Sequence, residues 1–181
     1  MKRIITRLYD KKIDASGLAI FRLCFSLVML CEVIQLYYFR HLIYDKVPYI
    51  ELSEIDYTVP LLLWMASIVF IAIGLFTRVA SIVNYIFCLV FIATINSYEY
   101  HMFYVYMGVS FLFLFTSIEK VFSFDRLGLI LKHSNTRVTY KPSRKTSVLN
   151  YYAYVLCGIA FVYFDSIFYK TASYNWLNGM G

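Results

Sequence analysis

The chain has 181 residues and a formal net charge of +6, and 61% of its residues are hydrophobic while only 15% are charged. Soluble domains carry about 25% charged residues, so this composition excludes an ordinary soluble protein and predicts an all-α integral membrane protein. The basic residues flank the apolar segments, which a cytoplasmic location explains, and we therefore expect no nucleic-acid partner.

Five apolar segments each come close to the roughly 20 residues that a helix needs to cross a bilayer. They cover residues 17–39, 60–77, 79–96, 102–118 and 148–170. The first is longer than the apolar core of a signal peptide and has no small-residue cleavage site after it, so we expect it to remain. Pro60 suits the first turn of the second helix, and Gly74 marks the end of that helix.

Lysine and arginine counts predict which loops face the cytoplasm. The amino-terminal tail and the loop at 119–147 are rich in these residues, whereas the loop at 40–59 carries more acidic than basic residues. We therefore expect a cytoplasmic N-terminus, a basic cytoplasmic loop at 119–147 and an extracytoplasmic C-terminus. That loop is the expected linker within a single transmembrane domain covering 1–181.

The cysteines and histidines do not indicate a metal site. Cys24, Cys31, Cys88 and Cys157 lie in apolar stretches without a C-x-x-C pair, and the three histidines are scattered along the chain. Zinc sites need such ligands at close, regular spacing. We therefore expect the cysteines to pack in the bundle or to face lipid, and we expect no metal.

Arg22 lies close to the cytoplasmic end of the first segment. A charged side chain at mid-membrane costs about 2.5–3.5 kcal/mol on insertion scales, so it needs a partner or an escape to the interface. Its long side chain favours snorkelling to the headgroups. The alternative is a buried structural pairing.

Glu32 has a shorter side chain and lies roughly 10 Å below the outer end of the first segment at 1.5 Å per residue. We therefore expect it to face other helices. Gln35 follows at i+3 and shares this face. Two interpretations stay open, because the pair either lines a small polar site or bonds to a neighbouring helix.

The last apolar segment contains Asp165, Ser166 and Lys170. Ser166 shares a helix face with Lys170, whereas Asp165 is rotated roughly 140° from it, so a direct Asp–Lys pair on the helix surface is not expected. Asp165 then needs a partner on another helix or in water. Lys170 either has a role in a site or simply extends to the interface.

Several polar residues share one depth, because the expected topology places them in the outer half of the membrane or at its rim. They are Glu32, Gln35, Asn96, Glu99, His101, Asp165 and Lys170. Brought together by several helices, they would form a cavity open to the outside, in which a desolvated lysine becomes a base.

Four stretches carry a family resemblance, and they occur in one order along the whole chain. They are "LAIFR" at 18–22, "GLFTRVASIVNYIF" at 74–87, "FSFDRL" at 122–127 and "YFDSIFYKTASYNWLNG" at 163–179. Together they resemble the horizontally transferred transmembrane (HTTM) domain proteins. This family includes the vitamin K-dependent gamma-carboxylases and the bacterial sporulation-delaying membrane proteins of the B type.

The resemblance implies a role for Lys170. In the gamma-carboxylases a lysine in this motif deprotonates reduced vitamin K, and the resulting alkoxide takes a proton from a glutamate side chain so that carbon dioxide can add. Lys170 is thus the candidate base, with reduced vitamin K or another lipid quinone as the implied cofactor. The family site faces away from the cytoplasm, and the charge count independently places Lys170 there.

The chain also departs from the family pattern. The spacing from Lys170 to Trp176 is one residue longer than in the carboxylases and closer to the sporulation-delaying type, and Asp165 and Ser166 replace apolar residues. Family members continue with further helices. We therefore expect the amino-terminal part of an HTTM bundle, either a fragment or a reduced version that pairs with a second membrane polypeptide.

These patterns predict a multi-pass protein of a bacterial plasma membrane that modifies or matures a small peptide at the outer membrane face. Lys170 is the candidate base or anion binder, and Glu32 and Asp165 are the candidate tuning charges. The rival is a non-catalytic partner or immunity-type protein that binds another membrane protein through Asp165 and Glu32. A third interpretation is an inactive truncated fragment.

Overall fold

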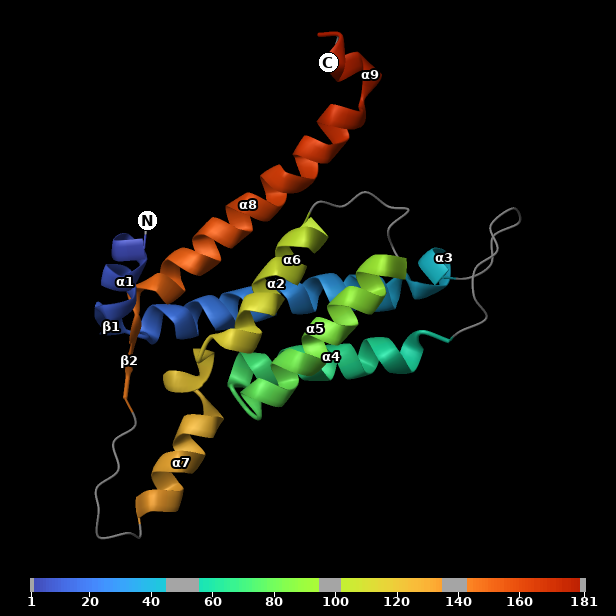
Figure 1. Ribbon diagram of the computed structural model, residues 1–181. Helices are drawn as coiled ribbons and strands as arrows, with labels where there is room; N and C mark the ends of the chain where they lie inside the picture. Colours follow the sequence, from blue (N-terminus) through green and yellow to red (C-terminus); the bar gives the residue numbers. More distant parts are fainter. Residues whose placement is uncertain (1, 45–55, 95–101, 135–142, 180–181) are drawn as a thin grey trace. The chain divides into compact units, whose positions relative to one another are not determined.

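A computed structural model describes residues 2–44, 56–94, 102–134 and 143–179, and most of these residues are helical (Figure 1). They divide into two compact units, which are described separately below. The first unit comprises Met1–Ile13, Cys88–Thr116 and Thr146–Gly181. The second unit comprises Asp14–Phe87 and Ser117–Lys145.

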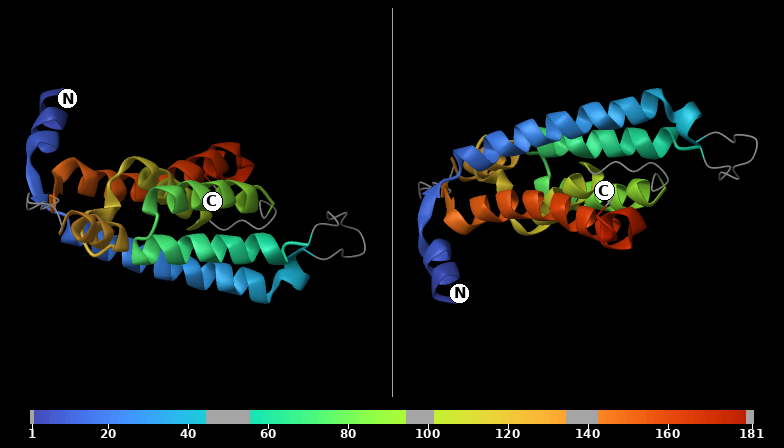
Figure 2. Two further views of the ribbon diagram at one scale, coloured as in Figure 1. Left: turned by 90° about the horizontal axis from the view of Figure 1, so that it is seen from below. Right: turned by 90° about the horizontal axis from the view of Figure 1, so that it is seen from above.

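The second unit is built on a long helix and a helical hairpin. Its helices are α2 (Ser16–Tyr38), α3 (Arg40–Tyr44), α4 (Thr58–Ile73), the part of α5 (Thr77–Thr94) up to Phe87, the 3-10 helix η1 (Ile118–Lys120) and α7 (Phe124–Ser134). Helices α2 and α4 run side by side, as both views of Figure 2 show.

One face of α2 is buried. Its residues recur at helical spacing and include Leu18, Met29 and Val33. The matching stripe of α4 comprises Leu61, Trp64, Ser67, Ile68 and Ile71. The C-terminal end of α2 is linked to the start of α4 by Arg40, which donates from Nε to the Thr58 hydroxyl at 3.2 Å.

The first unit contains α1 (Lys2–Asp10), the end of α5, α6 (Met102–Phe115), α8 (Val148–Ala172) and α9 (Tyr174–Leu177). Helices α6 and α8 pack together, and the Phe113 and Tyr154 rings meet edge to face at 5.6 Å between centroids. The Val148 amide donates to the Lys11 carbonyl at 3.0 Å, which joins the amino-terminal helix to the start of α8. Strands β1 (Lys12–Asp14) and β2 (Lys145–Ser147) pair in a two-stranded sheet.

The helical character of all five apolar segments is confirmed, since α2, α4, α5, α6 and α8 coincide with them. Within the described residues, α2 is the one helix both long and apolar enough to cross a bilayer. Helices α4 and α6 have 16 and 14 residues. At 1.5 Å per residue they span only about 24 and 21 Å, less than a typical hydrocarbon core. A five-span topology therefore stays a prediction.

The loop expected at 119–147 contains regular structure in addition to connecting segments, and its cytoplasmic location stays a prediction. It holds most of η1, all of α7 and β2. The segment "FDRLGLILKHS" places Phe124, Leu127 and Leu131 at i, i+3 and i+7, so it forms a helix with one apolar face.

Candidate functional site

Arg22 is the most deeply buried charged residue of the second unit, with no exposed surface. Its Nη1 donates to the Ile118 carbonyl at 2.9 Å, and its Nη2 donates to the Phe122 carbonyl at 2.5 Å. The planar fork of a guanidinium suits two acceptors at once, and the turn around η1 supplies them. The expected snorkelling of Arg22 is therefore wrong, and the alternative of a buried structural pairing is confirmed.

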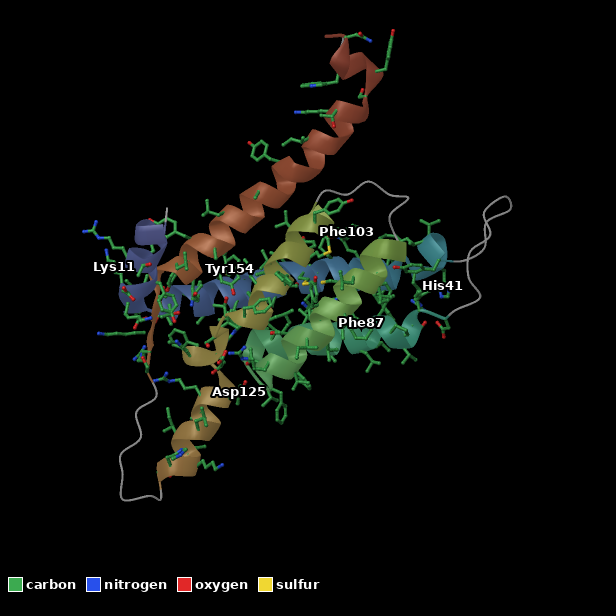
Figure 3. The ribbon with its side chains drawn as sticks, viewed as in Figure 1. Lys11, His41, Phe87, Phe103, Asp125 and Tyr154 are labelled. Atoms are coloured by element: carbon green, nitrogen blue, oxygen red, sulfur yellow. The ribbon has the colours of Figure 1, made fainter. Side chains whose placement is uncertain are left out.

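Asp125 caps the start of α5 across the same region, and it points toward the α4–α5 turn (Figure 3). Its carboxylate accepts hydrogen bonds from the Phe76 amide at 2.8 Å, and from the amide and hydroxyl of Thr77 at 2.8 and 2.7 Å. In return, the Asp125 amide donates to the Gly74 carbonyl at 2.9 Å. A carboxylate at a helix N-terminus satisfies free amides and interacts favourably with the helix dipole.

Gly74 completes this arrangement by ending α4 in the left-handed conformation, at φ 72° and ψ 42°. A side chain there would overlap Ser123, and its Cβ would lie 3.0 Å from the Arg22 Nη1. We call Arg22, Gly74, Thr77, Ser123 and Asp125, with the carbonyls of Ile118 and Phe122, the Arg22 cluster. Most of its polar groups form hydrogen bonds with one another, and these bonds link α2, the α4–α5 turn and the segment from η1 to α7.

The Arg22 cluster unites three of the four stretches that carry the family resemblance. Arg22 ends "LAIFR", Gly74 and Thr77 belong to "GLFTR", and Asp125 belongs to "FSFDRL". These stretches are far apart in sequence, yet each contributes to one set of hydrogen bonds. The motif residues in this unit are therefore explained by packing and by hydrogen bonding within the chain.

Replacing Asp125 with alanine is expected to lower the free energy of unfolding by about 1.5–3 kcal/mol, because hydrogen bonds to a charged acceptor are lost and the amide and hydroxyl of Thr77 stay half-buried. Asp125→Asn keeps one acceptor oxygen, so its free energy of unfolding should lie between those of the alanine variant and the parent. The measurement is a sodium dodecyl sulfate titration of the purified chain in mixed micelles. Equal stability of all three proteins would contradict the capping role.

Lys170 lies in the last turns of α8, in the first unit, and its side chain is exposed. Helix α8 ends at Ala172, Ser173 is extended, and α9 then carries Trp176 back toward the lysine. The Lys170 Nζ lies 4.5 Å from the centroid of the Trp176 ring. A cation–π contact of this kind is worth about 0.5–1 kcal/mol at an exposed site. The sequence motif contains Trp176, but its spacing did not predict that the ring contacts the Lys170 amine.

The other predicted site residues are distributed over both units. Glu32 lies half-buried in α2 of the second unit, whereas Asp165 lies in α8 of the first unit, five positions before Lys170. Gln35 is exposed on α2. Asn96, Glu99 and His101 lie outside the described residues. The expected meeting of these groups at one cavity therefore stays a prediction.

Sequence reasoning missed a buried polar link inside the hairpin of the second unit. The Trp64 Nε1 donates to the Asn84 Oδ1 at 2.9 Å, which joins α4 to α5. Both side chains are buried. A lone asparagine in an apolar segment signals such a partner, but its spacing alone does not say which residue supplies it.

An apolar groove with a volume of about 400 Å³ lies between α4 and α5. It is lined by Leu63, Ala66, Ser67, Phe70, Phe76, Val79, Ala80, Val83 and Phe87. The groove belongs to the second unit, whereas Lys170 belongs to the first unit, so its lining gives no support to a quinone acting at Lys170, and we derive no step through a quinone.

Comparisons with known proteins add no relative: no family model matches the chain, and no match is found among the curated proteins or the solved structures.

Proposed function

We propose that the chain is a multi-pass membrane protein of the HTTM type, with α2, α4, α5, α6 and α8 crossing the bilayer. Large apolar side chains stand exposed along the helices of the second unit, and they support this proposal. They include Ile20, Leu27, Val28 and Ile34 on α2, Leu62, Leu63 and Phe70 on α4, and Val79, Ile82 and Ile86 on α5. Soluble monomers rarely expose contiguous apolar surface of this kind. The shorter helices are accommodated by local thinning of the bilayer.

At the outer face, we propose that Lys170 binds a carboxylate of a small acidic peptide. The observation that carries this proposal is the contact between Lys170 and Trp176, 4.5 Å from Nζ to the ring centroid. The face of an aromatic ring attracts the charged ammonium, so Trp176 stabilises the cation. A charged amine binds an anion but has no lone pair with which to take a proton. The contact therefore favours anion binding over the role of base that the gamma-carboxylases imply.

The orientation of Lys170 also suits a ligand that arrives from the aqueous phase. Both Lys170 and Trp176 are exposed, and the helix break at Ser173 fixes the ring beside the amine. A pre-positioned cation loses less side-chain entropy when it binds than a free one. Exposed ion pairs are weak, so we expect modest affinity from this contact alone.

Substitutions at Lys170 separate anion binding from base catalysis. Lys170→Ala is expected to weaken binding of a fluorescent hexaglutamate peptide to proteoliposomes about fivefold, the equivalent of about 1 kcal/mol. Lys170→Arg should bind within about twofold of the parent, because arginine keeps the charge and stacks well on tryptophan. The peptide affinity of Trp176→Ala should lie between those of Lys170→Ala and the parent, because the amine is then no longer held beside the ring.

The control is Lys132→Ala, which removes an exposed lysine on the predicted cytoplasmic side and should leave peptide binding unchanged. If Lys170→Arg binds as weakly as Lys170→Ala, charge is not what matters and the anion-binding proposal fails. The rival, a non-catalytic membrane partner, makes a different prediction: changes at Lys170 are tolerated, and Asp165→Ala abolishes co-purification of a second membrane protein.

A further inference from the structure

We propose that α7 and two neighbouring phenylalanines form an anchor on the anionic surface of the cytoplasmic leaflet. This surface, the α7 anchor, consists of Phe76, Phe122, Phe124, Leu127 and Leu131 with the basic side chains around them. The proposal rests on the transmembrane arrangement proposed above and concerns the face opposite to Lys170. It assigns the α7 anchor a partner of defined chemistry, a bilayer rich in acidic lipids.

The apolar face of α7 is complete and uncovered. Phe124, Leu127 and Leu131 recur at i, i+3 and i+7, so they lie on one face of the helix. They are 56%, 48% and 62% exposed, and α7 has no buried residue among those described. Lys132 flanks this face, about 100° around the helix from Leu131. Helices with an apolar face and a basic face lie in the plane of a membrane interface.

Two strained phenylalanines also lie exposed at the end of the second unit where α7 begins. Phe76 and Phe122 have φ angles of 47° and 51°, and they are 65% and 62% exposed. Bulky residues rarely adopt this conformation, and here hydrogen bonds of Phe76 with Asp125 and of Phe122 with Arg22 hold it. The exposed rings that result suit a membrane interface, where aromatic residues are enriched.

The hydrogen bonds of the Arg22 cluster hold α7 at a defined depth. Asp125, in the first turn of α7, is bonded to Phe76 and Thr77, and Arg22 holds the carbonyl of Phe122. Helix α7 therefore begins at the α4–α5 turn, where the apolar hairpin ends. Figure 1 shows α7 leaving this end of the hairpin obliquely to α2 and α4, so α7 does not continue the direction of the spanning helices.

Charge complementarity selects acidic lipids as the occupant. The described residues around the α7 anchor carry Lys120, Arg126, Lys132, Arg144 and Lys145. Of the three acids in this region, Asp125 binds the start of α5, the Glu119 Oε2 is buried without a hydrogen-bond partner, and only Asp14, near Arg144, is exposed. The outward charge is thus positive. Juxtamembrane basic clusters attract the anionic lipids of the cytoplasmic leaflet.

Quenching by brominated lipids tests the anchor in the full-length chain. A bimane label is placed at Leu127→Cys or Leu131→Cys, with Leu129→Cys as the control, because Leu129 is the same residue type on the opposite face of α7. The native cysteines are replaced by alanine at Cys24, Cys31, Cys88 and Cys157. In nanodiscs of phosphatidylcholine with phosphatidylglycerol, we expect lipids brominated in the acyl chains to quench labels at 127 and 131 at least threefold more than at 129. Equal quenching at all three positions overturns the proposal.

The lipid charge is tested with Lys132→Glu, and amide hydrogen exchange of the unmodified chain avoids any effect of labelling. Addition of phosphatidylglycerol should increase quenching at 131 about twofold in the parent and not in Lys132→Glu. Exchange in residues 124–134 should slow severalfold in the acidic nanodiscs relative to phosphatidylcholine alone. If amide exchange in residues 124–134 is the same in both kinds of nanodisc, the proposal is overturned. It is also overturned if a co-purifying protein protects these residues in both kinds. Neither readout depends on Lys170, so failure here leaves the peptide-binding proposal standing.

Discussion

Replacing Arg22 with alanine is expected to lower the free energy of unfolding by about 3–5 kcal/mol, the range seen when one partner of a buried charged interaction is removed. The substitution removes the donor from the Ile118 carbonyl, whose hydrogen bond is buried, and from the Phe122 carbonyl, whose hydrogen bond is half-buried. Each buried acceptor without a partner costs about 1–3 kcal/mol. A sodium dodecyl sulfate titration in mixed micelles, followed by tryptophan fluorescence, measures the change.

Two further variants, Arg22→Lys and Arg78→Ala, make this test more specific. Arg22→Lys keeps a charge but presents a point donor in place of a fork, so we expect at least half of the alanine effect. Arg78 is the control: it is exposed, and its Nη2 lies 3.4 Å from the Ser117 hydroxyl. Arg78→Ala should change stability by less than about 1 kcal/mol. Similar effects at Arg22 and Arg78 would mean that Arg22 reaches the headgroups after all.

Replacing Gly74 with alanine is expected to lower the free energy of unfolding by about 2–5 kcal/mol. The left-handed backbone costs an ordinary L-residue about 1–2 kcal/mol. The new methyl group would overlap Ser123 and press on the Arg22 guanidinium, and such overpacking typically costs about 1–3 kcal/mol more. The same denaturant titration reports the loss, and amide exchange should show that α7 opens first.

Gly128 is the matched control for Gly74. It lies in the middle of α7, and a Cβ built there has no neighbouring atom within 4 Å. Gly128→Ala should therefore raise helix stability by about 0.5–1 kcal/mol, because alanine restricts the unfolded chain and favours the helix. If both alanines act in the same direction, the steric argument at Gly74 is wrong.

The sequence by itself determined the helices. Long apolar runs must satisfy their own backbone hydrogen bonds, and helical pairing does this locally. For that reason the segments at 17–39 and 148–170 could be recognised without tertiary information, and they match α2 and α8 within two residues at each end. Gly74 as the end of a helix could also be predicted, because the left-handed conformation belongs to glycine.

Only the tertiary structure decided what the polar residues do. Arg22 bonds to carbonyls 96 and 100 positions away, and Asp125 caps a helix that begins 48 positions earlier, so no local pattern names these partners. Helical spacing places Lys170 on a face of α8, but the break at Ser173 sets Trp176 beside it. Periodicity reports the direction of a side chain on its own helix, whereas a hydrogen-bond partner depends on which other segment packs there.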